Sequence, residues 1–100
     1  MTLKFPEIKT ELPGKKGKRI IAKDSHYASR SYIKEYPLVI ERGEGAIVED
    51  VDGNRFLDFM AGIAVNITGY SHPKVVEAVK RQSDKFFHIC STGYCSRYFL

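Results

Sequence analysis

The sequence has no long apolar run and only two cysteines among its 100 residues. No segment is apolar over the length that a membrane-spanning helix needs. The first ten residues carry Lys4, Glu7 and Lys9 in place of the apolar core of a signal peptide. Cys90 and Cys95 could close a short loop, but a chain without a secretion signal favours free thiols. We therefore expect a cytoplasmic chain that has no membrane partner.

Several chemical motifs are also missing. The spacing of His88, Cys90 and Cys95 matches no standard pair of zinc ligands, and no fourth ligand lies nearby, so we expect no metal site. The chain has neither a phosphate-binding loop of the P-loop or dinucleotide type nor the Gly-x-Ser-x-Gly motif of a nucleophile elbow. Taken alone, the residues therefore indicate little chemistry.

Positive charge is concentrated in one place. The net charge is +4, and the excess comes largely from Lys15, Lys16, Lys18 and Arg19. Such a run could be a nucleic-acid-binding or anion-binding arm. A solvated, flexible segment is the more common alternative, and no aromatic residues are interleaved to stack on bases. We expect no nucleic-acid partner.

The first 36 residues show weak apolar periodicity. Pro6, Pro13, Gly14 and Gly17 interrupt any regular pattern. We expect residues 1–36 to form an N-terminal arm that is poorly ordered by itself, with a short helix at about residues 20–27.

Residues 38–59 carry the pattern of an antiparallel β-meander. β-favouring residues at 38–40 are followed by the break at Gly43–Gly45, and a second run covers residues 46–51. Asp52 and Gly53 tolerate the positive φ of a type I′ turn, which predicts a hairpin into a third strand at residues 55–59. Because three short strands are marginal alone, we expect this sheet to pack on something else.

A glycine-punctuated loop and a helix follow the meander. Gly62 and Gly69 lie in the mostly apolar segment 60–72 and indicate sharp backbone turns. Pro73 suits the first position of a helix, and apolar residues recur at helical spacing up to about Phe87. The final residues 98–100 are an apolar run without a cap, which we interpret as the start of another helix.

Four segments together resemble a known family. Read in order, Tyr36–Ile40, Gly43–Phe59, Ala61–Asn66 and Gly69–Val76 are similar to the opening of the class III, fold-type I, pyridoxal-phosphate aminotransferases. This family includes 4-aminobutyrate, ornithine and acetylornithine aminotransferases and related racemases. The resemblance covers roughly residues 36–90. It departs at Tyr70, where the family commonly has histidine.

The resemblance implies an α/β enzyme with the fold of pyridoxal-phosphate-dependent transferases. Such an enzyme has a large domain with a mostly parallel sheet and a smaller domain built from both chain ends. The present segment would be α+β, a short antiparallel meander followed by a helix. We expect residues 37–100 to be the N-terminal part of the small domain, leading towards the large one, with a meander at 38–59, an active-site loop at 60–72 and a helix at 73–87.

The resemblance also implies where a substrate would bind. The positions of Gly62 and Ile63 line the substrate pocket in similar enzymes, and Thr92 and Tyr94 fall near the substrate or the dimer partner. The Schiff-base lysine, the aspartate that pairs with the pyridinium nitrogen and the phosphate-binding loop lie downstream of the matched region in the family. We therefore expect no catalytic and no cofactor-binding residue in this segment.

The function implied is that of an N-terminal part of an aminotransferase. The whole enzyme would bind pyridoxal 5′-phosphate and move an amino group from an amino acid or an ω-amino acid, such as 4-aminobutyrate, to a 2-oxo acid. We expect it to be a homodimer or a larger oligomer, and the 100-residue segment alone to be inactive. The alternatives are a non-catalytic interaction module descended from such an enzyme and an amino-acid racemase on the same scaffold.

Overall fold

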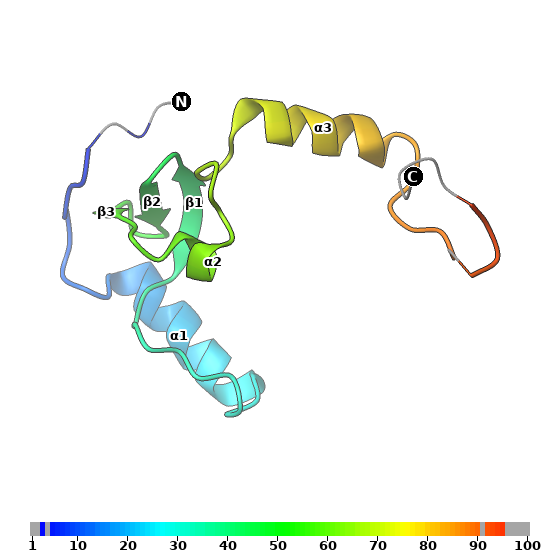
Figure 1. Cartoon of the computed structure of the whole chain (residues 1–100). Helices are drawn as coiled ribbons and strands as arrows, with labels where there is room; N and C mark the ends of the chain where they lie inside the picture. Colours follow the sequence, from blue (N-terminus) through cyan, green and yellow to red (C-terminus); the bar gives the residue numbers. More distant parts are fainter. Residues whose placement is uncertain (1–2, 4, 91, 96–100) are drawn as a thin grey trace.

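The computed structural model describes residues 3, 5–90 and 92–95 as a small antiparallel sheet with helices on either side of it in the sequence. The sheet has the order β1-β2-β3, so consecutive strands are neighbours. The α+β meander predicted for this segment is confirmed, but its first strand covers Ile40–Glu44 and includes Gly43, where the sequence predicted a break. The final residues 98–100, predicted to begin a helix, lie outside the described part. The elements are α1 (Lys15–Tyr27), β1 (Ile40–Glu44), β2 (Ile47–Asp50), β3 (Arg55–Leu57), α2 (Ala61–Ala64) and α3 (Pro73–Ser83) (Figure 1).

The turn between β2 and β3 differs in type from the prediction. The Asp50 amide donates to the Asn54 carbonyl, and the Gly53 amide donates to the Asp50 carbonyl. Gly53 alone has a positive φ, +85°, so the hairpin has a three-residue loop with one left-handed residue and is not a type I′ turn. The physical reason is the Asp50 carboxylate, which accepts hydrogen bonds from the Asp52 and Asn54 amides and holds the wider loop.

The N-terminal arm, expected to be poorly ordered by itself, is bound to this hairpin. Glu7 exchanges two backbone hydrogen bonds with Arg55, and their side chains form an ion pair. The fully buried Asn54 side chain accepts hydrogen bonds from the Lys9 and Thr10 amides, at 2.7 and 3.0 Å. These contacts join positions 44 to 48 residues apart, which local sequence patterns do not report.

The first helix begins at Lys15, five residues before the predicted start. The Asp52 carboxylate accepts hydrogen bonds from the Lys16 and Gly17 amides, at 2.9 and 2.8 Å. These amides lack partners within a helix, so a side chain from the hairpin acts as the missing N-cap. The Gly17 hydrogen bond is the main reason that the pKa of Asp52 is lowered from its ordinary value.

The last helix ends at Ser83, four residues before the predicted Phe87. The amides of Lys85 and Phe86 both donate to the Gln82 carbonyl, which closes the helix in a turn. As Figure 1 shows, α3 projects away from the sheet. Its Val75 and Val79 side chains are exposed in the described chain.

The apolar core of the described residues is very small. Only Leu3, Ile47 and Val48 are buried apolar side chains. The radius of gyration is 17.6 Å, whereas a compact domain of this length has a value of about 13 Å. The sheet therefore presents apolar surface that the described residues do not cover. None of the described helices has the length and apolar character needed to cross a membrane.

Candidate functional site

The loop that follows β3 is closed at both ends by one hydrogen-bonded pair. Asp58 lies just after the strand, and the Tyr70 hydroxyl donates to its carboxylate at 2.9 Å. The same carboxylate accepts hydrogen bonds from the Met60 and Ala61 amides, at 3.1 and 2.9 Å. Side chains twelve positions apart thus define a closed loop that contains Gly62 and Ile63.

Within this loop, α2 is a left-handed turn. Ala61, Gly62, Ile63 and Ala64 have φ values of +48°, +61°, +61° and +60°. The Val65 and Asn66 amides both donate to the Ala61 carbonyl. A left-handed conformation costs L-residues roughly 1–2 kcal/mol each, most clearly for β-branched isoleucine. Such strain is concentrated at functional loops, where surrounding contacts hold it in place.

The turn presents its side chains outwards. Ile63 is 81% exposed, and the neighbouring apolar residues Phe59, Val65 and Ile67 are also exposed. The expected sharp turns at Gly62 and Gly69 are confirmed, since both residues have positive φ. Residues 59–67 thus expose apolar side chains and include no titratable side chain.

The far end of the loop is fixed to the sheet. Tyr70 and Gly45 exchange two backbone hydrogen bonds of 2.8 and 2.9 Å. A Cβ on Gly43 would lie 2.7 Å from the Tyr70 ring, and a Cβ on Gly69 would lie 3.0 Å from Gly45 Cα. Glycine at both positions is therefore required for the close approach of the loop and the β1–β2 turn.

The ionisation of Asp58 and Tyr70 reflects their contact. Burial disfavours the charged carboxylate, but hydrogen bonds from the Met60 amide, the Tyr70 hydroxyl and the Ala61 amide outweigh it and lower the pKa of Asp58. Donation to Asp58, with partial burial, raises the pKa of Tyr70. Smaller opposing effects come from the Asn66 side chain and the Gly62 backbone. At neutral pH the pair is thus a phenol donating to a carboxylate.

The other two predicted substrate residues lie elsewhere in the described chain. Thr92 and Tyr94 belong to a turn in which the Gly93 and Tyr94 amides donate to the Cys90 carbonyl. In Figure 1, α3 lies between α2 and this turn. The described residues therefore do not bring Thr92 and Tyr94 close to Gly62 and Ile63. A hydrogen bond of 2.9 Å links Thr92 Oγ1 to Cys90 Sγ and is the main cause of the lowered pKa of that thiol.

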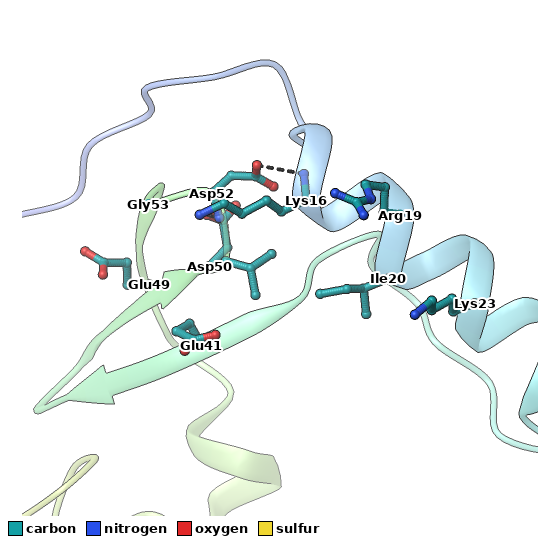
Figure 2. A pocket seen from close by; sticks show the side chains of 10 residues that line it. Lys16, Arg19, Ile20, Lys23, Glu41, Glu49, Asp50, Asp52 and Gly53 are labelled. Atoms are coloured by element: carbon teal, nitrogen blue, oxygen red, sulfur yellow. Dashed lines mark hydrogen bonds between the residues drawn. The ribbon is translucent and has the colours of Figure 1, made fainter.

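The basic run lies along α1, beside a cleft of about 640 Å³ between that helix and the sheet (Figure 2). Charged side chains of opposite sign line the cleft from its two sides: Lys16, Arg19 and Lys23 from α1, and Glu41, Glu49 and Asp52 from the sheet. Acidic side chains therefore accompany the basic ones on the side of α1 that faces the cleft.

Sequence reasoning singled out Gly62 and Ile63, whose substrate-facing role stays a prediction, but missed Asp58 and Tyr70, which hold their loop. Asp58 interrupts the apolar pattern between Leu57 and Phe59 and precedes Ala61 by three positions, which is the spacing of an N-terminal cap. That signal could have indicated its role. The role of Tyr70 depends on a contact across twelve positions, for which the sequence has no local signal.

Comparison with known proteins places this loop in a family. The model of class-III aminotransferases matches residues 27–98. An alanine/serine racemase of Pyrococcus horikoshii is 44% identical over 87 residues, and a 4-aminobutyrate aminotransferase of Mycobacterium bovis is 41% identical over 81 residues. These matches cover 86% and 81% of this chain, and 18% of each relative.

A solved structure shares the fold. The acetylornithine aminotransferase of Elizabethkingia anophelis superposes with a TM-score of 0.74 at 32% identity, over 81% of this chain and 21% of the other. The chain spans about a fifth of the length of the proteins that it matches. Most of the sequence agrees with one family model, and the fold agrees with a member of that family. The chain belongs to the class-III aminotransferase family.

Proposed function

We propose that these residues form the N-terminal segment of a pyridoxal-phosphate-dependent aminotransferase. Residues 1–36 would be its N-terminal arm, and residues 37–100 the beginning of its small domain, leading towards the large one. The loop between Asp58 and Tyr70 carries the proposal, because it exposes Gly62 and Ile63 on a strained turn within the segment that matches the family. We further propose a cytoplasmic homodimer that transfers an amino group to a 2-oxo acid.

The described residues do not fit pyridoxal phosphate as a complete site. That cofactor needs a lysine for the Schiff base, an acidic partner for its ring nitrogen and a phosphate-binding helix N-terminus. The described lysines are all exposed, and none lies in the loop between Asp58 and Tyr70. We propose that residues beyond this segment hold the cofactor, and that this segment contributes only to substrate binding.

We propose Gly62, Ile63, Thr92 and Tyr94 as the substrate-facing residues, and a 4-aminobutyrate-like ω-amino acid as the donor. Ile63 has no polar group to pair with the α-amino group that ornithine carries and 4-aminobutyrate lacks, which suits 4-aminobutyrate better than ornithine. The similarity to an alanine/serine racemase supports racemisation as a second candidate activity.

Replacing Ile63 with tyrosine in the complete enzyme is expected to change the donor preference. The ratio of kcat/KM for 4-aminobutyrate to that for ornithine should fall by about tenfold or more, the usual effect of reshaping a pocket. Ile63→Leu is the matched control, because it keeps the volume of an aliphatic side chain, and it should leave the ratio nearly unchanged. An unchanged ratio in Ile63→Tyr contradicts the placement of Ile63 in the pocket.

The first measurement is the intact mass of the protein purified from its natural source, together with its visible absorbance. We expect a mass several times the 11.4 kDa of these residues and the absorbance of bound pyridoxal phosphate. Incubation with 4-aminobutyrate or alanine, with and without a 2-oxo acid, then separates transamination from racemisation. A protein of 11.4 kDa without bound cofactor would instead support the non-catalytic interaction module.

A further inference from the structure

The Tyr70 hydroxyl lies at the centre of the loop that carries Ile63. It donates to Asp58 Oδ2 at 2.9 Å. A Cβ added to Gly62 would lie 2.9 Å from Asn66 Nδ2, which places that amide directly beside the turn. The hydroxyl is therefore bonded to the carboxylate that holds the beginning of the turn, and Asn66 lies at the end of the same turn.

The ring that carries this hydroxyl is held independently of the turn. Backbone hydrogen bonds in both directions fix Tyr70 to Gly45, and its ring packs against Gly43. Gly43 lies in β1 and Gly45 follows it at the β1–β2 turn. The Tyr70 ring is thus fixed to the sheet by contacts that do not involve residues 61–64.

The turn needs such support because its conformation is unfavourable. Ala61, Ile63 and Ala64 are left-handed at roughly 1–2 kcal/mol each, and α2 has no buried residue to offset this cost. Asp58 binds the first two amides of the turn, and the Tyr70 hydroxyl fixes the orientation of that carboxylate. Without the hydroxyl, the turn could relax towards right-handed backbone angles, which would move the Ile63 side chain.

We propose that Tyr70 is a positioning residue for the amino-donor site, whose hydroxyl holds the left-handed turn Ala61–Ala64 so that Gly62 and Ile63 face the substrate. This inference rests on the proposed function for its substrate but not for its geometry. Two measurements therefore test it: amide hydrogen exchange, which requires no enzymatic activity, and KM for the amino donor.

The test is Tyr70→Phe in the complete protein, which removes the hydroxyl and keeps the ring against Gly43. Amide hydrogen exchange at residues 60–66 is expected to become about tenfold faster, because the turn opens more often. KM for the amino donor should rise by about tenfold, with kcat within about threefold, since donor binding geometry is lost and the cofactor is untouched. Tyr27→Phe, at a tyrosine that is 81% exposed, is the matched control.

Each outcome decides the inference. Exchange at residues 60–66 within twofold of the unchanged protein overturns it, whether or not the protein transaminates. Faster exchange with an unchanged KM also overturns it, because Tyr70 would then stabilise the loop without positioning it. A complete protein that lacks aminotransferase activity refutes the proposed function, and the exchange result alone then judges the role of Tyr70.

A double variant tests whether Tyr70 acts through the Asp58 carboxylate. If Tyr70 acts by orienting Asp58, then the effect of Tyr70→Phe on exchange should shrink to less than about twofold in an Asp58→Ala background, because coupled residues are not additive. If the two substitutions instead multiply their effects on the exchange rate, Tyr70 does not act through Asp58.

Discussion

Replacing Asn54 with alanine is expected to detach the N-terminal arm from the hairpin. The Asn54 side chain accepts from the Lys9 and Thr10 amides and donates to Asp50 Oδ2 and Thr10 Oγ1, and it is fully buried. Losing these partners, and leaving Asp50 partly unsatisfied, should cost about 3–4 kcal/mol. The Lys9 and Thr10 amides should exchange with solvent much faster, and urea unfolding of the complete protein should begin earlier.

Thr10→Val is the matched control for this substitution. It removes one hydrogen bond of Asn54 and an exposed local one to the Glu11 carbonyl, keeps both bonds from the arm amides, and should cost about 1 kcal/mol. Equal effects of the two variants would show that the arm is not held by Asn54.

Replacing Gly69 with alanine is expected to separate the loop from the sheet. Gly69 has a φ of +80°, and a Cβ there would lie 3.0–3.2 Å from backbone atoms of Gly45, which cannot move as a side chain can. The left-handed backbone should cost about 1 kcal/mol, and the crowding a further 1–3 kcal/mol. The Tyr70–Gly45 hydrogen bonds should weaken, so KM for the amino donor should rise as well.

Gly53→Ala separates the cost of the left-handed backbone from the cost of crowding in Gly69→Ala. Gly53 has a similar φ of +85°, but nothing lies within 4 Å of its added Cβ. It should show the backbone cost alone, in thermal unfolding measured beside Gly69→Ala. If both variants lose the same stability, the close approach of Gly69 to Gly45 does not constrain the loop.

Local signals accounted for the meander, the start of the last helix and the sharp turns at Gly62 and Gly69. These features depend on neighbouring residues: turn-forming glycines, alternating apolar positions and Pro73 at a helix N-terminus. The expectation that the loop faces the substrate came from the resemblance to a family and stays a prediction, since the residues alone did not indicate it.

The missed features depend on distant contacts or oppose local preference. Asp52 caps α1 from 35 positions away, so the early start of that helix has no signal in its own sequence. Left-handed Ala61, Ile63 and Ala64 contradict the preferences of their residue types. Sequence rules are expected to fail in this way where a protein maintains strain for a function.

The contacts between the arm and the hairpin also set an order of events during synthesis. Lys16 is added 36 residues before Asp52, and at about 5–20 residues per second the interval between the two is roughly 2–7 s. Throughout it, α1 has no N-cap and the arm has no partner for its Lys9 and Thr10 amides. Closure of the β2–β3 turn supplies Asp52 and Asn54 within three residues, so the arm and the first helix become fixed together.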